Sequence, residues 1–303
     1  MRTPFRGVTN REALIFRGER FAEWSPFVEY EDSEASVWLK AAMSWANDPL
    51  PEIFRESIGI NATLPAVKPD QVSEVLKSFT PFTTVKIKVA APGESIADDL
   101  ARIHAVTRHF PEAKIRLDAN GGYSVSQALE LVEKLGSTKL EYLEQPVATV
   151  TDMAQLRESL TGSGIKIAAD ESIRKSGDPD EVQRLKAADI VMLKSQPLGG
   201  IQASLEVADR LGLEVVVSSA LETSLGIAQG LYLAAALPKL NYDCGLGTVN
   251  LLAGDVAVSP MKPVDSKLEL TVPEVDLELL EKYAASPERT KWWLERLERC
   301  LDF

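Results

Sequence analysis

The sequence is poor in the two residue types that most often bind zinc or form covalent links. It has two cysteines and two histidines among 303 residues. Cys244 and Cys300 lie too far apart for a metal or disulfide motif, so both are expected to be free thiols in a reducing compartment. His104 and His109 fall in a segment expected to be helical, away from the strand ends, which argues against a histidine base.

Other signatures are also missing. The net charge is −12 and no run is rich in lysine and arginine, so nucleic acid is not an expected partner. No apolar stretch could span a membrane and the start lacks the apolar core of a signal peptide, so we expect a cytoplasmic protein with no membrane partner. P-loop and Gly-x-Ser-x-Gly motifs are absent, and Gly199-Gly200 and Gly245-x-Gly247 do not form a dinucleotide fingerprint. ATP, NAD and serine-hydrolase chemistry therefore have no support.

What the sequence does contain is a regular series of polar residues that end short strand-like runs. From residue 118 onward they recur every 24 to 26 residues. That interval is typical of one βα unit, and in a closed βα barrel the carboxyl ends of the strands meet at one mouth. The residues are expected to face one another across one pocket: Lys88, Asp118, Glu144, Asp170, Lys194 and Ser218.

The repeat occupies only the middle of the chain. We predict an α/β fold: a (β/α)7β TIM-like barrel over residues 58–254, preceded by an α+β capping domain over 1–57. The N-terminal part is expected to contain a hairpin, with strands at 13–16 and 20–24, and a helix at 34–46. Residues 255–303, which carry Trp292 and Trp293, are expected to pack back on the capping domain.

Two residues near the strand ends are interpreted as helix caps rather than as site residues. Ser124-Val-Ser-Gln127 has the pattern of a capping box. Asp178-Pro-Asp-Glu181 combines an expected N-cap, a proline in the first turn and an acidic third position.

Three carboxylates on successive strands, Asp118, Glu144 and Asp170, indicate a magnesium site. A single acidic residue at a strand end would mean little, but three in phase are hard to explain otherwise. Carboxylate oxygens with positions left open for water and substrate favour Mg²⁺ over zinc, with Mn²⁺ as a substitute.

Lysines complete the expected pocket. Lys86 and Lys88 are two residues apart on one strand, so both should point inward beside the metal. Mutual repulsion and a nearby cation lower lysine pKa values, which would free one lysine to act as a base. Lys194 should approach from the opposite side. A metal flanked by two such lysines suits removal of a proton beside a carboxylate and stabilisation of the resulting enolate.

At this point the residues resemble a known family over nearly the whole chain. The motifs look like those of the muconate-lactonising subgroup of the enolase superfamily, and within it most like the o-succinylbenzoate synthases of actinobacterial type. In the N-terminal part they are Phe5-Arg-Gly-Val-Thr-Asn-Arg11 and Glu23-Trp-Ser-Pro26. In the barrel they are Lys86-Ile-Lys88, Leu117-Asp-Ala-Asn120, Leu143-Glu-Gln-Pro146, Ala169-Asp-Glu-Ser172, Lys194 with Gly199-Gly200, and Ser218-Ser-Ala-Leu-Glu222.

The resemblance implies a lyase of menaquinone biosynthesis that dehydrates 2-succinyl-6-hydroxy-2,4-cyclohexadiene-1-carboxylate to o-succinylbenzoate. Lys88 would abstract the α-proton and then protonate the departing hydroxyl, Lys194 would stabilise the anion from the other face, and Lys86 would tune Lys88 and contact the substrate carboxylate. The three carboxylates would bind Mg²⁺. Further residues would surround the metal or contact substrate: Asn120, the wall residues Ser218, Ser219 and Gly247, and Arg11 of a capping loop over 5–11.

Some alternatives stay open. Family members have a strand ahead of the capping loop, whereas here the loop follows Met1 almost at once, so either the chain starts late or the capping sheet is one strand short. The same lysines could serve N-succinyl amino acid racemisation, cycloisomerisation or dipeptide epimerisation, because catalytic residues report the shared half-reaction. A barrel that senses a metabolite without turning it over is a further alternative. The expected partner is a small carboxylate, and a monomer is favoured without excluding an oligomer.

Overall fold

The computed structural model describes residues 1–5, 7–136 and 138–303. Its N-terminal part is a small α+β element. Strands β1 (Leu14–Arg17) and β2 (Phe21–Trp24) form an antiparallel hairpin, followed by helix α1 (Asp32–Asn47). One face of α1 is apolar, and its buried residues include Trp38 and Trp45. The hairpin and helix expected from the sequence are confirmed.

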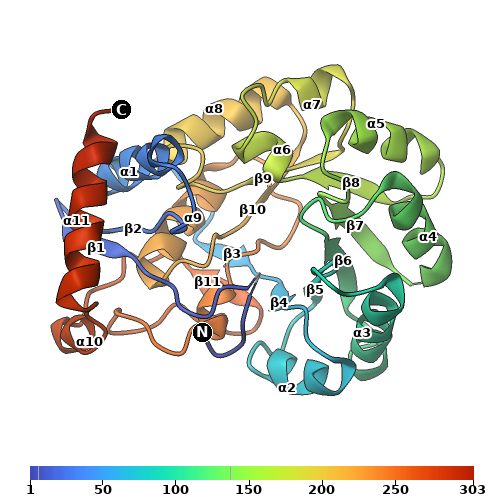
Figure 1. Cartoon of the computed structure of the whole chain (residues 1–303), viewed down its shortest axis with the longest axis horizontal. Coiled ribbons are helices and arrows are strands. Elements are labelled where there is room, and N and C mark those ends of the chain that lie inside the picture. The colour runs from blue at the N-terminus through green and yellow to red at the C-terminus, as the bar shows by residue number, and fades with distance from the viewer. Residues whose placement is uncertain (6, 137) are drawn as a thin grey trace.

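The middle of the chain forms a seven-stranded parallel sheet curled into a barrel, with helices around its outside (Figure 1). The strands pair in sequence order, so each is hydrogen-bonded to the strand of the next βα unit. Their bounds are β4 (Ala62–Leu64), β5 (Thr84–Lys88), β6 (Lys114–Asp118), β7 (Leu140–Glu144), β8 (Lys166–Ala169), β9 (Ile190–Leu193) and β10 (Glu214–Val217).

An eighth, extended segment closes the barrel. Cys244 makes a parallel bridge with Ile60, just before β4, and Gly245 makes a parallel bridge with Ser218, just after β10. Residues 244 and 245 therefore join the two edges of the sheet. The predicted (β/α)7β barrel is confirmed.

Helices follow the strands and cover the outer face of the sheet. The capping box at Ser124 is confirmed, since its hydroxyl accepts the Gln127 N–H at 3.3 Å and the Gln127 side chain accepts the Ser124 N–H at 2.9 Å. The helices are α2 (Val72–Lys77), α3 (Ile96–His109), α4 (Val125–Leu135), α5 (Val150–Ser159), α6 (Glu171–Arg174), α7 (Glu181–Arg184), α8 (Ile201–Leu211) and α9 (Ser224–Ala236), with 3₁₀ turns η1 (Pro69–Gln71) and η2 (Thr248–Leu251).

The expected cap at Asp178 is wrong. Helix α7 begins at Glu181 after Asp180, and no side chain caps it. The Asp178 carboxylate instead accepts a hydrogen bond from Arg184 Nη2 at 2.6 Å. The helix begins later than the sequence pattern suggests, so Asp178 stands ahead of the N-cap position, and its carbonyl accepts the Glu181 N–H at 3.2 Å.

The C-terminal residues return to the N-terminal element. Strand β11 (Lys267–Glu269) pairs with β3 (Ser57–Gly59), and after α10 (Leu277–Lys282) the long helix α11 (Pro287–Leu301) lies beside α1 (Figure 1). The rings of Trp24 and Trp293 meet edge-on at 5.3 Å. Arg296, almost fully buried, donates to the carbonyls of Phe27 and Tyr30. The domain boundaries at 57/58 and 254/255 stay a prediction.

Both cysteines are free and buried. In the described part of the chain, no helix has the length and apolar character needed to cross a membrane.

Candidate functional site

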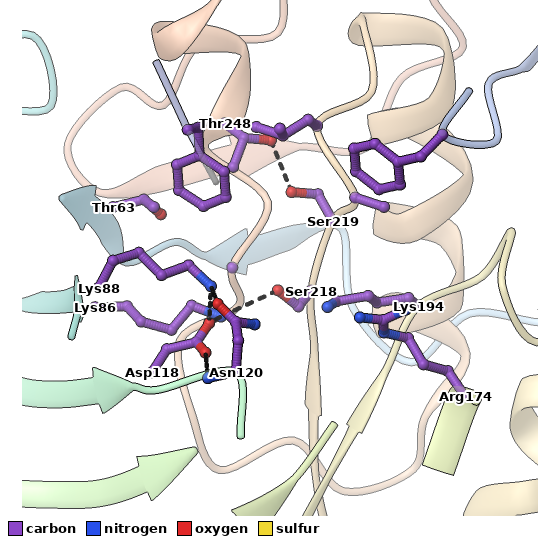
Figure 2. A pocket seen from close by; sticks show the side chains of 15 residues that line it. Thr63, Lys86, Lys88, Asp118, Asn120, Arg174, Lys194, Ser218, Ser219 and Thr248 are labelled. Carbon is purple, nitrogen blue, oxygen red and sulfur yellow. Dashed lines mark hydrogen bonds and ion pairs between the residues drawn. The ribbon is translucent and has the colours of Figure 1, made fainter. Parts of the chain in front are cut away.

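A pocket with an empty volume of about 490 Å³ opens at the carboxyl ends of the barrel strands. Seven of the residues expected at the site line it: Lys86, Lys88, Asp118, Asn120, Lys194, Ser218 and Ser219. Figure 2 shows the lysines of β5 on one side of the pocket and Lys194 on the other. The lining residues are Phe5, Phe27, Thr63, Lys86, Lys88, Asp118, Asn120, Arg174, Lys194, Ser218, Ser219, Ala220, Leu221, Gly245 and Thr248.

The lysines of β5 reach into the pocket together because alternate residues of a strand share a face. Lys86 Nζ donates to both oxygens of Glu144, at 3.1 and 3.0 Å, and lies 3.7 Å from Asp118 Oδ2. Lys88 Nζ donates to Asp118 Oδ2 and to Asn120 Oδ1, the latter at 2.7 Å. Both ammonium groups are thus fixed among carboxylates at the bottom of the pocket.

The opposite side is built from β8 and the residue after β9. Asp170 directly follows β8 and is fully buried; its Oδ2 accepts from Lys194 Nζ at 2.5 Å, while its Oδ1 accepts from Arg174 Nε at 3.1 Å. The predicted meeting of lysines and carboxylates from five strands in one place is therefore what the structure contains.

Charge and burial shift the acid–base properties of this cluster. Burial, then the neighbouring Asp118 carboxylate, raises the pKa of Glu144 to about 7. Although burial opposes it, the pKa of Asp118 is lowered by Lys88 and Lys86, and that of Asp170 by Lys194 and Arg174. Burial lowers the pKa of Lys88, partly offset by Asp118. Lys88 therefore loses its proton more easily than Lys86, whose pKa is raised by Glu144 and Asp118 despite burial.

The three carboxylates fit a divalent cation by their chemistry. Asp118, Glu144 and Asp170 are at most 1% exposed, offer only hard oxygen ligands, and are close enough for Asp118 and Asp170 each to raise the pKa of Glu144. Among the described residues no group of three or more His, Cys, Asp or Glu side chains is already arranged as a metal site, and each of these carboxylates contacts an ammonium group instead.

Arg174 is a pocket residue that the sequence analysis missed. Besides Asp170 it binds Glu171, whose Oε1 accepts from Arg174 Nη2 at 2.6 Å and from Asn120 Nδ2 at 3.2 Å. Its Nη1 donates to the Tyr30 hydroxyl of the N-terminal element at 3.3 Å. Arg174 follows Asp170 by one helical turn, a spacing that could have suggested the contact.

One wall of the pocket, called the upper wall here, is formed by the polar residues Ser219 and Thr248 and the apolar residues Ala220 and Leu221. The Ser219 and Thr248 hydroxyls are hydrogen-bonded to each other at 2.7 Å (Figure 2). Of the residues expected there, Ser218 and Ser219 line the pocket, whereas Gly247 is outside the lining set and packs near Ile60.

Arg11 is also outside the lining set and lies behind this wall. Its guanidinium donates to the carbonyls of Ser25 and Ala220 and stacks over the Phe27 ring at 4.4 Å. The expected capping loop over 5–11 includes residue 6, which is outside the described residues. Phe5, at its start, lines the pocket and lies 5.1 Å from Lys88 Nζ, measured to the ring centroid.

Comparison with known proteins shows the family to which this chain belongs. The enolase C-terminal domain-like family matches residues 70–274, and the enolase N-terminal domain-like family matches residues 1–46. Over 302 residues, the chain is 47% identical to an o-succinylbenzoate synthase of Mycolicibacterium smegmatis, covering 99% of this chain and 92% of the relative. For the o-succinylbenzoate synthase of Mycobacterium tuberculosis the values are 46%, 99% and 91%. The chain belongs to the o-succinylbenzoate synthase family of the enolase superfamily.

Solved structures of the superfamily show the same fold at lower identity. A muconate cycloisomerase from Pseudomonas fluorescens aligns with a TM-score of 0.75 at 20% identity, covering 89% of this chain and 92% of that one. An N-succinyl Arg/Lys racemase from Bacillus cereus aligns with a TM-score of 0.68 at 22% identity, covering 81% and 72%. These likenesses confirm the superfamily fold.

Proposed function

We propose that this protein dehydrates 2-succinyl-6-hydroxy-2,4-cyclohexadiene-1-carboxylate to o-succinylbenzoate in menaquinone biosynthesis. The observation that carries the proposal is one pocket with Lys88 and Lys194 on opposite sides, where Lys88 is paired with Asp118, Lys194 with Asp170, and Lys86 with Glu144. Relatives named o-succinylbenzoate synthase, 46–47% identical over nearly the whole chain, support this choice of reaction.

We assign Asp118, Glu144 and Asp170 as the ligands of Mg²⁺, or of Mn²⁺ in its place. When bound, the cation would polarise the substrate carboxylate and stabilise negative charge that develops on it. With Asp118 and Asp170 engaged as metal ligands, Lys88 and Lys194 would no longer depend on them as ion-pair partners and could face the substrate.

Lys88 is assigned as the base that removes the proton beside the carboxylate and then returns it to the departing hydroxyl. Its lowered pKa suits this role, because a general base works best when its pKa is near the working pH. Lys194 is assigned as a fixed positive charge on the other face of the substrate. Lys86 keeps its proton, since Glu144 and Asp118 raise its pKa despite burial, and so would bind the substrate carboxylate.

Asn120, Ser218 and Ser219 line the same pocket and are assigned to substrate or metal-ligand contacts. Direct contacts of Gly247 and Arg11 with substrate have less support, because Gly247 packs near Ile60 and Arg11 donates to the carbonyls of Ser25 and Ala220. A cytoplasmic location and a monomer stay predictions.

Racemisation of N-succinyl amino acids is a second candidate, favoured by one observation. Lys88 and Lys194 lie across the pocket from each other, as two-base racemisation requires, and a racemase shares the fold. The two functions differ in what Lys194 must do. A dehydratase needs only its charge, whereas a racemase needs it to transfer protons.

Turnover of both substrates by wild type, Lys88→Ala and Lys194→Arg separates the candidates. For the dehydratase, Lys88→Ala should abolish turnover of the cyclohexadiene and Lys194→Arg should keep a trace of it. For a racemase, either change stops racemisation, although exchange of one proton with solvent can continue. Good racemisation by wild type without dehydration of the cyclohexadiene would overturn the proposal.

A further inference from the structure

Arg11 belongs to the N-terminal element, yet its guanidinium reaches the backbone of the barrel loop that forms the upper wall of the pocket. Its Nη2 donates to the Ala220 carbonyl at 3.3 Å and also to the Ser25 carbonyl, and its Nη1 lies 3.5 Å from the Pro26 carbonyl. The same guanidinium stacks on Phe27, whose ring lines the pocket. One side chain thus touches two pocket-lining residues from behind.

The backbone of Ala220 is engaged on both sides. Its carbonyl accepts from Arg11, and its N–H donates to Glu222 Oε2 at 2.6 Å. The next residue, Leu221, lines the pocket with φ of +67°, a left-handed conformation that costs a branched side chain on the order of 1–2 kcal/mol and persists only where surrounding contacts hold it. Both polar groups of the Ala220 backbone are thus occupied, and Ala220 and Leu221 line the pocket beside them.

A second contact between the same two parts of the chain fixes the end of this loop. Glu23 of β2 accepts from the N–H groups of Thr223 at 3.0 Å and Gly226 at 3.2 Å, at the start of α9. Arg11 is the cation that faces Glu23 and Glu222 in this buried group. The loop over 219–223 is therefore held from the N-terminal element at both its middle and its end.

We propose that Arg11 is a positioning residue for substrate: it holds the Ala220–Leu221 wall and the Phe27 ring in place, so that the pocket presents a preformed apolar surface to the part of the substrate remote from the carboxylates. The identity of the substrate in this proposal is taken from the function proposed above. It does not require Arg11 to touch substrate, and it places the effect of Arg11 on the side of the pocket away from Asp118, Glu144 and Asp170.

The test compares Arg11→Lys with wild type and with Arg20→Lys. Lysine keeps the charge but cannot reach several carbonyls at once. Arg20 is a matched control, because it belongs to the same element, donates to the Asp48 carbonyl and stacks on Trp45, away from the pocket. Arg11→Met is made as well, since it keeps an apolar contact with Phe27 and places no charged group of its own behind the wall. Circular dichroism establishes that each variant is folded at the assay temperature.

Hydrogen exchange of a peptide covering 218–223 gives a readout independent of activity. We expect both Arg11 variants to exchange this peptide on the order of ten-fold faster than wild type, and Arg20→Lys to match wild type. Exchange equal to wild type in the folded Arg11 variants would show that Arg11 does not hold the wall.

Kinetics and magnesium titration test the consequence for substrate. We expect KM for the cyclohexadiene to rise about ten-fold in Arg11→Lys with a smaller change in kcat, because contacts to a remote part of the substrate act mainly on binding. Calorimetric Mg²⁺ affinity should equal that of wild type. An unchanged KM in Arg11→Lys, or a loss of Mg²⁺ affinity as large as the rise in KM, would refute the assignment of Arg11 as a positioning residue. A wild type that fails to dehydrate the substrate would refute the proposed function, while exchange at 218–223 would still decide the role of Arg11.

Discussion

The buried carboxyl of Glu222 should make the fold less stable at pH 8 than at pH 5. Its pKa is raised from the ordinary 4.5 to about 7, chiefly by burial and to a smaller extent by the nearby Glu23 carboxylate. A carboxyl with a higher pKa in the folded state than in the unfolded chain favours folding when protonated; this contribution is complete below about pH 4.5 and is lost as the pH rises through 7. Glu222→Gln removes the titration while keeping an oxygen that can accept the Ala220 N–H.

The size of the effect follows from the pKa difference. A rise in the pKa from 4.5 to about 7 corresponds to ~3 kcal/mol of stability. Almost all of this stability is lost at pH 8, whereas less than ~1 kcal/mol of it is lost at pH 5. The free energy of unfolding of Glu222→Gln minus that of wild type should therefore be ~2 kcal/mol larger at pH 8 than at pH 5, so the variant gains stability over wild type as the pH rises.

Urea unfolding at both pH values measures this difference. Glu298→Gln, an exposed glutamate of α11, is the control and should show none. The same stability difference between Glu222→Gln and wild type at pH 5 and pH 8 would refute the assignment of burial as the cause.

Three shorter predictions concern the metal, a helix contact and the C-terminal helix. Asp170→Asn, or excess chelator acting on wild type, should abolish turnover while circular dichroism stays unchanged; full activity in chelator would contradict the metal assignment. Gly226→Ala should lower unfolding free energy by ~1–3 kcal/mol, because its Cβ would lie 2.4 Å from Glu222 Cβ; a wild-type urea midpoint would contradict this. Trp293→Ala should cost ~3–5 kcal/mol, since Trp293 is 4% exposed and packs on Trp24; a smaller loss in thermal or urea unfolding would show that the site collapses around the gap.

The barrel and its charged pocket could be predicted because their signal is periodic. Each βα unit returns the chain to the same mouth, so residues such as Asp118 and Lys194 share a location without any knowledge of packing. The shared direction of Lys86 and Lys88 could be predicted because alternate side chains of a strand point to the same face. The structure places both side chains in the pocket.

Residues held by contacts distant in sequence could not be predicted in the same way. Arg11 was expected to contact substrate, but its acceptors are Ser25 and Ala220, the second 209 residues away, and meeting them places it behind the wall. The spacing of Arg174 from Asp170 is local, but its contact with Tyr30 joins residues 144 apart in sequence and could not be read from that spacing. Asp178 had the sequence of a cap, and only the structure shows that Arg184 binds its carboxylate.

The packing of α11 on the N-terminal element imposes an order on biosynthesis. Trp24 and the carbonyls of Phe27 and Tyr30 leave the ribosome long before Trp293 and Arg296, their partners, have been translated. The N-terminal element is thus made before the barrel but completes its core after it. Because that element also supplies Arg11 and Phe27 to the pocket, a nascent chain with a finished barrel would still lack a finished site until residues 287–301 have emerged.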